Sequence, residues 1–498
     1  MKSNIVIINP DQMRADSLSH LGNPASVTKN LDILAQEGVS FRNAFCQNPV
    51  CTPSRCSFMT GWYPHVHGHR TMTHMLQNYE PVLLKELKDS GYHVWMNGRN
   101  DLIPAQSPDY PMGHCSTYFV PKEAPERPAD TGWRGAPDGD NYYSFHQGKT
   151  EPLRDLDQLW VEGARDFIRD YDSMENEGKP FCIYLPLMNP HPVYAVPEPY
   201  FSMIDRGKLP PRIDPGNFEG KPRILKELHK LQRLQNWDEP RFDELRATYL
   251  AMCCRVDDFV GMIVDQLKAS GLYDDTAIFI FSDHGDYTGD YGLVEKVQNC
   301  FEDCLTNVPF LVKLPEWMKT KGTKTGVSEE LVELIDFYAT VEELAGLTPS
   351  HTHFGRSLIP YLQGKSEGLR DAVFCEGGCR EGEDHCKETG GGPSPRPEML
   401  YYPRQSLQCS DEFIYNGKAV MCRTKRYKYI RRLYEPDELY DLENDPQELN
   451  NLAHNSDYRE ISMKMKEKLL NFYLDTCDVV PFQKDQRFDK SMQEMMRH

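Results

Sequence analysis

Asn4-Ile5-Val6-Ile7-Ile8-Asn9, close to the start of the chain, is a short run of β-branched apolar residues between two asparagines. A run of this length and composition predicts a strand that is buried on both faces of a parallel sheet. Similar runs occur at 181–187, 277–281 and 310–314, and segments with helical periodicity lie between them. Strands that alternate with helices are typical of α/β proteins. We therefore expect an α/β fold with a mostly parallel central sheet flanked by helices.

The chain is long enough for two domains, since its 498 residues exceed the size of about 250–300 residues at which single cores stop growing. Between residues 375 and 410 the sequence is rich in Gly, Pro, Cys and charged residues, which predicts a long loop. The segments beyond this loop with strand or helix character are 419–423, 427–431 and 461–473. We predict an α/β domain at 1–370 and a smaller C-terminal α+β domain at 371–498.

The charge balance narrows the class of partner. The chain has 56 Lys and Arg against 75 Asp and Glu, a net charge of −19. Such a surface repels nucleic acid and anionic membranes, so we expect neither as a partner. We find no secretory signal and no apolar run near the ~20 residues of a membrane span, which predicts a cytoplasmic protein. The odd number of 15 cysteines then favours reduced thiols over a disulfide framework.

Potential metal ligands follow two of the predicted strands. Asp11-Gln12 comes after the first strand, and Asp283-His284-Gly285-Asp286 comes after the strand at 277–281. Ligands of open α/β folds lie beyond the carboxyl ends of strands, so these side chains are expected to meet. Carboxylate and amide oxygens with one imidazole suit a divalent cation of the Ca²⁺, Mg²⁺ or Mn²⁺ kind. The alternative is that the acidic residues only form turns or cap helices.

A third feature is Cys51-Thr52-Pro53-Ser54-Arg55. Pro53 suits the first turn of a helix and Gly61 suits its end, so Cys51 and Arg55 are predicted to lie one turn apart on the same face. The N–H groups and dipole of a helix N-terminus favour an anion, and a guanidinium binds anionic oxygens. The pattern indicates a site for a tetrahedral oxyanion beside a nucleophile, although a lone Cys is more often a small buried apolar residue.

The Cys51–Arg55 run, continued by Thr60-Gly61-Trp62-Tyr63-Pro64 and by His67-Gly68, resembles the signature of the sulfatase family in the alkaline phosphatase superfamily. In that family a maturation enzyme oxidises the Cys to formylglycine, whose hydrate is the nucleophile. The resemblance implies that residues 1–370 form a catalytic domain that hydrolyses the sulfate ester of a small molecule or saccharide. It also implies one divalent cation, with Ca²⁺ expected and Mg²⁺ or Mn²⁺ as alternatives. The implied metal-site residues are Asp11, Gln12, Cys51, Asp283 and His284.

The resemblance extends to two further side chains. Asn189-Pro190-His191-Pro192 is similar to the family segment that carries a substrate-side histidine, and Lys296 follows the Asp283-His284 pair at the distance of the sulfate-binding lysine. The implied mechanism has Arg55 and Lys296 stabilise charge on the ester oxygens, and His191 protonate the leaving alcohol. Without the resemblance, His191 is a histidine in a Pro-rich turn and Lys296 a surface lysine.

The sequence departs from the family pattern at two places. Gln12 stands where many sulfatases have a second Asp. In having Gln at this position, the sequence resembles the choline sulfatase and phosphonate monoester hydrolase branches. Gly98-Arg99-Asn100-Asp101 replaces the common Gly-Lys-x-His element. Arg99 can bridge the nucleophile and neighbouring oxygens as the lysine does, but Asp101 cannot copy an imidazole. These departures leave open a phosphodiester or phosphonate monoester hydrolase with the same nucleophile, and a plain turn at 98–101. A non-catalytic binding protein with a relict site is a third interpretation.

Two other groups of residues have no assigned role. A zinc site is conceivable at Cys375, Cys379, His385 and Cys386, but their spacing is not a paired CxxC pattern. An aromatic segment that can stack on a sugar or aryl ring, or pack as an ordinary loop, contains Trp133, Tyr142, Tyr143, Phe145 and His146.

Overall fold

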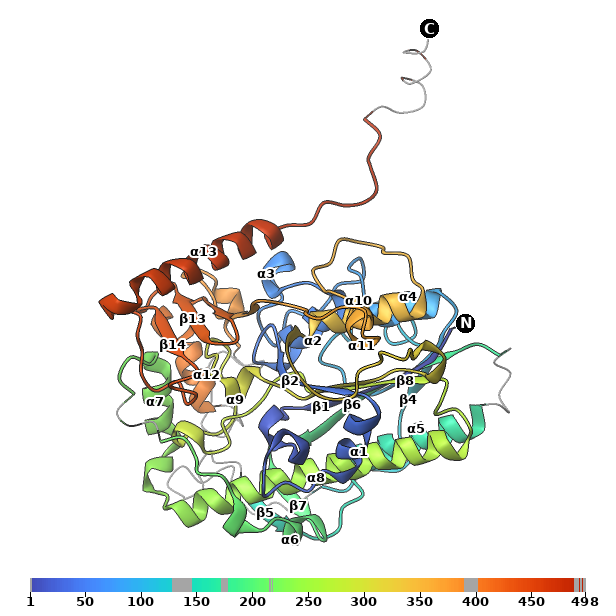
Figure 1. Cartoon of the computed structure of the whole chain (residues 1–498), viewed down its shortest axis with the longest axis horizontal. Helices are drawn as coiled ribbons and strands as arrows, with labels where there is room; N and C mark the ends of the chain where they lie inside the picture. Colours follow the sequence, from blue (N-terminus) through green and yellow to red (C-terminus); the bar gives the residue numbers. More distant parts are fainter. Residues whose placement is uncertain are drawn as a thin grey trace.

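The computed structural model describes residues 2–127, 146–171, 178–214, 216, 218–388, 402–487, 492 and 495. Its main sheet contains β1 (Asn4–Asp11), β2 (Val39–Phe45), β3 (His93–Asn97), β4 (Thr117–Phe119), β6 (Phe181–Pro190), β8 (Thr276–Phe281), β9 (Phe310–Lys313) and β10 (Gly326–Glu333). The strand order is β10-β2-β9-β8-β1-β6-β3-β4 (Figure 1). All neighbouring pairs are parallel except the two that involve β9. The predicted mostly parallel α/β fold is confirmed.

Strand β1 shows why this sheet is buried. Ile5 and Ile7 belong to one hydrophobic cluster, and Val6 and Ile8 belong to another on the opposite face. Because successive side chains of a strand alternate between faces, an unbroken apolar run fills two cores at once. The strand therefore lies in the middle of the fold, between β8 and β6.

Helices cover both faces of the sheet (Figure 1). The helices on the lower side in this view are α1 (Lys29–Glu37), α5 (Leu156–Asp170) and α8 (Glu239–Ala269). Those on the upper side are α2 (Cys51–Thr60), α4 (Leu83–Asp89), α10 (Ile335–Ala345) and α11 (Ile359–Leu362). The other α-helices and strands in the described part of the chain before residue 371 are α3 (Pro64–His67), β5 (His146–Thr150), β7 (Tyr194–Pro197), α6 (Tyr200–Met203), α7 (Arg223–Gln232) and α9 (Asp303–Thr306).

The run at 310–314 forms a strand as predicted, but the prediction that it is parallel is wrong. β9 pairs antiparallel with β8 and with β2. The reason lies in the connection, because residues 282–309 contain only a 3₁₀ turn at Asp290–Gly292 and the single-turn helix α9, and no helix that crosses a face of the sheet. A strand that re-enters a sheet at the edge where its neighbour left must run in the opposite direction. The connection therefore stays at the carboxyl edge of β8.

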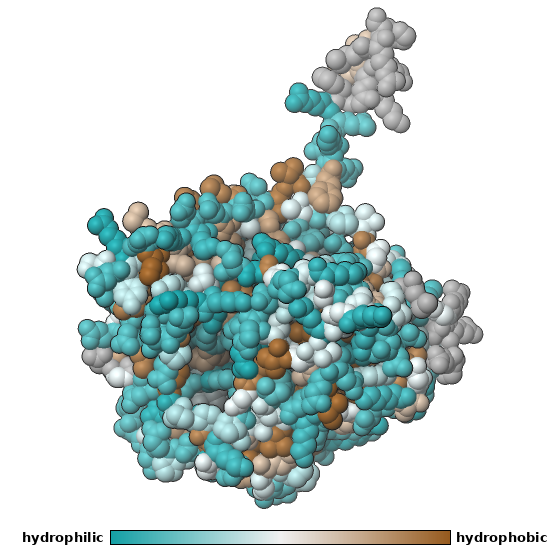
Figure 2. Space-filling model, viewed as in Figure 1, coloured by the Kyte–Doolittle hydropathy of each residue, from teal (hydrophilic) through white to brown (hydrophobic). Residues whose placement is uncertain are grey.

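The C-terminal part is a small α+β unit, as predicted. It contains α12 (Tyr402–Gln408) and an antiparallel sheet of β11 (Val373–Gly377), β12 (Ala419–Arg423), β13 (Tyr427–Arg432) and β14 (Glu438–Asp441), with α13 (Arg459–Thr476) packed on it. Figure 2 shows a largely hydrophilic surface with hydrophobic residues gathered along α13. Met463, Leu470 and Leu474 of this helix are exposed. Thus α13 buries one face against the sheet and presents apolar residues to solvent on another. The boundary at 370/371 stays a prediction.

Buried charges join the small sheet to the main one. The Glu333 carboxylate at the end of β10 accepts hydrogen bonds from the Phe374 N–H at 2.7 Å and from the Tyr63 hydroxyl at 2.7 Å. Arg370 Nη1 lies 2.8 Å from Glu333 Oε2, and its Nη2 pairs with Asp336. Glu333 and Asp336 are fully buried. The guanidinium of Arg370 therefore compensates two carboxylates that water does not reach.

All 15 cysteines are free thiols. The side chains of Cys375, Cys379, His385 and Cys386 do not form a group with metal-ligand distances among the described residues. No helix in the described part of the chain is long and apolar enough to cross a membrane.

We expect Arg370→Leu to lower the free energy of unfolding by about 3–5 kcal/mol, because it leaves two buried carboxylates without their cation. A urea denaturation series followed by circular dichroism measures the effect. The control is Arg42→Leu, since Arg42 pairs at 2.8 Å with Glu329 while both side chains are exposed. That surface pair is worth at most about 1 kcal/mol. Equal losses in the two variants would contradict the role assigned to Arg370.

Candidate active site

Two acidic side chains meet at the carboxyl edge of the main sheet. Asp11 is the last residue of β1, and Asp283 follows the neighbouring strand β8. The Gln12 N–H donates a hydrogen bond to Asp283 Oδ1 at 3.1 Å, and the Asn9 side-chain amide donates to the Phe281 carbonyl at 2.7 Å. These bonds join the ends of the two strands. Both aspartates are fully buried.

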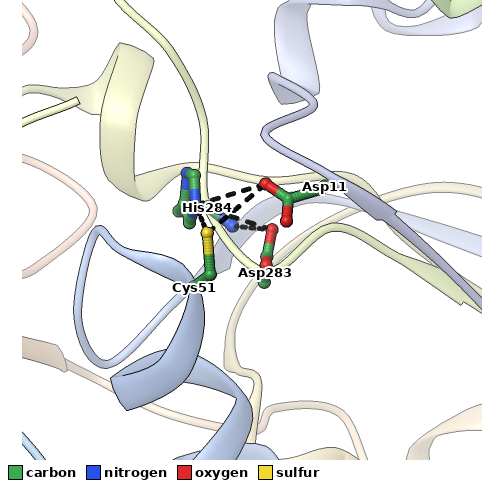
Figure 3. Close-up of side chains that lie close together, drawn as sticks. All are labelled: Asp11, Cys51, Asp283 and His284. Carbon is green, nitrogen blue, oxygen red and sulfur yellow. Dashed lines mark hydrogen bonds and ion pairs between the residues drawn. The ribbon is translucent and has the colours of Figure 1, made fainter. Parts of the chain in front are cut away.

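Cys51 is the first residue of α2, and its sulfur faces the two strand ends (Figure 3). Its Sγ lies 3.2 Å from His284 Nε2 and 3.5 Å from Asp11 Oδ1. The predicted helix is confirmed, since α2 spans Cys51–Thr60 and Gly61 caps it in the left-handed conformation. Burial, with the Asp11 carboxylate nearby, raises the pKa of the Cys51 thiol well above its usual range. The unmodified thiol is therefore a poor nucleophile at neutral pH.

Arg55 connects α2 to both aspartates. It is fully buried, and its Nη2 lies 3.0 Å from Asp11 Oδ2 and 2.8 Å from Asp283 Oδ2. Its Nε also donates to Asp283 Oδ2 at 3.0 Å. The guanidinium binds Oδ2 of each carboxylate, and Oδ1 of each carboxylate faces Cys51 (Figure 3). The predicted partner of a substrate oxyanion thus holds the two acids in place in this structure.

The donor atoms of Asp11, Cys51, Asp283 and His284 all lie within 4.8 Å of one another (Figure 3). His284 Nδ1–H donates to the Gly285 carbonyl at 2.9 Å, which directs Nε2 towards the cluster. Burial lowers the pKa of His284 and keeps the imidazole neutral, the form that binds metals. Two carboxylates, an oriented imidazole and a sulfur atom fit one divalent cation.

Gln12 has a different set of contacts. Its backbone is left-handed, with φ +70°. Its Oε1 accepts a hydrogen bond from Lys296 Nζ at 2.6 Å, and its Nε2 donates to Glu295 Oε1 at 3.3 Å and to Asp286. Gln12 therefore contacts the cluster through its backbone N–H, which binds Asp283, while its side chain binds Lys296, Glu295 and Asp286. Its role as a ligand stays a prediction.

Lys296 and His191 lie next to this cluster, each on a loop that follows a strand of the main sheet. Lys296 is buried and comes from the connection between β8 and β9, and the side chain of His191 is 8% exposed. His191 Nδ1–H donates to the Pro192 carbonyl at 2.6 Å. Burial and the charge of Lys296 lower the pKa of His191 to about 4, so its ring is neutral at pH 7 in this structure. The roles proposed for both residues remain predictions.

Arg99 and Asp101 lie on the loop after β3. The guanidinium of Arg99 pairs with Asp11 Oδ2, the oxygen that Arg55 also binds. Burial alone raises the pKa of Asp11, but Arg99 and Arg55 help hold it well below its usual range. Asp101 Oδ2 lies 3.2 Å from Arg99 Nη2, and its side chain is 26% exposed. Asp101 therefore balances Arg99 at the rim of the site.

Two site residues were absent from the sequence prediction. Glu295 is buried, and its Oε1 lies 3.4 Å from Lys296 Nζ. Arg404 of α12 lies 3.9 Å from Glu295 Oε2. An adjacent Glu-Lys pair in a sequence resembles a surface ion pair, and Arg404 lies within the 375–410 segment, for which the sequence predicts a loop. The one signal for Glu295 is its place directly before Lys296.

The aromatic segment has only one member within the described residues. Trp133, Tyr142, Tyr143 and Phe145 lie outside them. His146 begins β5, and its ring hydrogen-bonds with the Thr248 hydroxyl at 3.1 Å.

A cavity of about 310 Å³ adjoins His191. The residues that line it include Leu153, Met188, Val193 and Met252.

A mostly parallel α/β sheet that carries acidic and imidazole side chains at the ends of two adjacent strands, beside a Cys that begins a helix, is the arrangement expected of a hydrolase of the alkaline phosphatase superfamily. A family model described as Sulfatase matches residues 3–347 of the 498. The chain belongs to the sulfatase family and is a sulfuric ester hydrolase. A second model, described as N-sulphoglucosamine sulphohydrolase, C-terminal, matches residues 411–474.

Similar proteins span nearly the whole chain. The multifunctional alkaline phosphatase superfamily protein PehA of Trinickia caryophylli is 26% identical over 96% of both chains. An arylsulfatase of Clostridium perfringens is 26% identical over 92% of both. The crystal structure of the phosphonate monoester hydrolase of Agrobacterium radiobacter has a TM-score of 0.73 and 25% identity, and it covers 95% of this chain and 96% of its own. The resemblance to the phosphonate monoester hydrolase branch is thus confirmed.

We expect the protein to bind one divalent cation per chain, with Asp11→Asn weakening the affinity by about tenfold or more through loss of a charged ligand. Isothermal titration of the chelator-treated protein with Ca²⁺, Mg²⁺ and Mn²⁺ measures this. Asp257→Asn is the control, because Asp257 is equally buried but binds the backbone of α1 from α8. Unchanged affinity in Asp11→Asn, or an equal loss in the control, would rule out the site.

Proposed function

We propose that this sulfatase hydrolyses its ester through a formylglycine derived from Cys51 and one divalent cation held by Asp11, Gln12, Asp283 and His284. The observation that carries the proposal is the convergence of two carboxylates and an oriented imidazole on Cys51 Sγ. Because the chain belongs to the sulfatase family, Cys51 is the cysteine of the family signature, and it lies within this cluster of potential metal ligands. A formylglycine-generating maturation enzyme is then a required partner.

The two groups would supply the chemistry that amino acids lack. The hydrate of formylglycine supplies a hydroxyl nucleophile and lets sulfate leave by return to the aldehyde, while the cation supplies positive charge against the ester oxygens. Ca²⁺ is the ion we propose, because oxidation of Cys51 replaces a soft sulfur by hard oxygen and leaves an oxygen-rich donor set. Mg²⁺ and Mn²⁺ are the alternatives that titration separates.

The residues of the chain divide into two groups by what they contact. Arg55 and Arg99 bind the outer oxygen of Asp11 and so fix the geometry of the cluster. Arg55 also binds Asp283, and Asp101 balances the charge of Arg99. Lys296 belongs to the second group, the residues that would contact the ester. Its ammonium can neutralise the ester oxygens as negative charge develops on them. We assign it the role of an oxyanion-binding residue.

His191 is the residue we assign to the leaving alcohol. The cavity beside it can take the alcohol portion of an ester. An anionic ester next to the ring raises its pKa, because a nearby negative charge favours the imidazolium. His191 then holds a proton where the leaving oxygen departs. The cavity does not discriminate between a small alcohol and a saccharide, and both remain proposed substrates of a cytoplasmic enzyme.

A phosphonate monoester or phosphodiester hydrolase is the second candidate activity. The observation that favours it is Gln12 in place of a second acid at the cluster, together with similarity to the phosphonate monoester hydrolase. Kinetics with a nitrophenyl sulfate, a phenyl phosphonate monoester and a phosphodiester under one set of conditions would separate the two. The larger kcat/KM identifies the activity.

We expect Cys51→Ala to abolish turnover and to leave folding unchanged, because the side chain that becomes the nucleophile is missing. Steady-state kinetics and circular dichroism measure the two effects. Mass spectrometry of the peptide that contains Cys51, from cells with the maturation system, should show the aldehyde. Cys56→Ala is the matched control, since Cys56 is buried in the same helix and lies outside the cluster. Near-normal activity in Cys51→Ala would refute the proposal.

We expect His191→Ala to slow hydrolysis of alkyl or sugar sulfates by about 10²–10⁴-fold, and to slow a nitrophenyl sulfate far less. A poor leaving group needs the proton, whereas a nitrophenolate departs without one. Lys296→Ala is the comparison variant and should slow both substrates alike, because it contacts oxygens that every sulfate ester has. Equal losses on both substrates in His191→Ala would leave His191 with binding alone.

A further inference from the structure

Glu295 combines a strained backbone with a buried charge. Its φ is +71°, in the left-handed region that favours glycine, and only 3% of the residue is exposed. Its N–H donates to Asp286 Oδ1 at 3.2 Å, and its carbonyl accepts from the Tyr287 N–H at 3.1 Å. Glycine would meet this turn geometry at lower cost. Strain of this kind clusters at functional sites, so the carboxylate itself needs a role.

The carboxylate lies among the groups assigned to the ester. Its Oε1 is 3.4 Å from Lys296 Nζ, 3.3 Å from Gln12 Nε2 and 3.9 Å from His191 Nε2. These partners come from three different loops at the carboxyl edge of the sheet. Its Oε2 is 3.9 Å from Arg404 Nη1 of α12. Glu295 therefore adds a negative charge to the side of the site where Lys296 is to bind the substrate anion.

That negative charge affects ligands according to their own charge. A sulfate monoester and a phosphonate monoester each carry one negative charge at neutral pH, whereas a phosphate monoester carries nearly two, since its second pKa is about 6. Inorganic sulfate, the product, also carries two. Repulsion between buried charges a few ångströms apart is strong, because little water screens it. A carboxylate beside Lys296 thus acts against each additional charge.

We propose that Glu295 is a specificity-determining residue that makes the site select singly charged esters over doubly charged ones and weakens its hold on the dianionic product. This inference rests on the proposed function, because it assumes that Lys296 and His191 face the transferred group. Glu295 acts through Lys296 by cancelling part of its charge.

The chain contains a matched control for Glu295. Glu448 is also buried, has a left-handed backbone with φ +53°, and pairs with a lysine, Lys428. It lies in the C-terminal part and is not among the side chains that contact Gln12 or Lys296. A general effect of removing a strained buried glutamate would appear at both positions, whereas charge selection at the site would appear only at Glu295.

The experiment compares Glu295→Gln, Glu295→Asp and Glu448→Gln with the wild-type enzyme matured in cells. The measured quantities are kcat/KM for nitrophenyl sulfate and nitrophenyl phosphate, and the inhibition constant of inorganic sulfate. We expect Glu295→Gln to raise the phosphate-to-sulfate ratio of kcat/KM by about tenfold or more and to tighten sulfate inhibition. Glu295→Asp keeps the charge and tolerates a left-handed backbone, so it should retain the wild-type ratio. Glu448→Gln should retain it too.

An unchanged ratio and inhibition constant in folded Glu295→Gln would overturn the proposal, and so would an equal shift in Glu448→Gln. If Glu295→Gln does not fold, Glu295→Gly removes the charge and the strain together and should give the same shift. If the wild-type enzyme cleaves a phenyl phosphonate monoester and no sulfate ester, the proposed sulfate activity fails. The ratio is then taken against the phosphonate, which has the same single charge, so selection by Glu295 is still tested.

Discussion

The buried guanidinium of Arg55 is the constraint on which the rest of the site depends. A cation without solvent must have carboxylate partners, and Arg55 obtains them from the ends of two neighbouring strands, at Asp11 and Asp283. This fixes the first turn of α2 against the sheet edge. Cys51, one turn earlier on the same face, then lies with its Sγ 3.5 Å from the other carboxylate oxygen of Asp11. Arg55 thus sets the position of the reactive residue without contacting it.

The antiparallel direction of β9 also depends on this edge of the sheet, because the connection that precedes β9 stays there. Residues 282–309 do not cross a face of the sheet, so they remain where Asp283, His284 and Lys296 are needed together. A helical crossover would have carried Lys296 to the far side. The cost is a loop with several left-handed residues, among them Thr288, Tyr291 and Glu295. Strand direction and site composition are therefore two results of one connection.

The sequence alone predicted those features that are determined by a local pattern of residues. The apolar run of β1, the limits of α2 and the acids after β1 and β8 each depend on a few adjacent residues. The direction of β9 could not be predicted in this way, because it depends on the path of the preceding loop. Glu295 and Arg404 were missed because their contacts form only when separate loops meet. The side chain of Gln12 likewise follows Lys296, which lies far along the chain.

The link between the two sheets has a consequence for biosynthesis. Glu333 and Asp336 emerge from the ribosome before Arg370 and Phe374, which satisfy them in the finished protein. Asp303 is likewise synthesised before Arg423 and Lys428, the residues with which it forms ion pairs. The nascent chain thus lacks partners for these charges until synthesis is almost complete, which we expect to delay final packing. Cys51 is buried in the folded protein, so the maturation enzyme that the proposed function requires would have to reach it before this packing is complete.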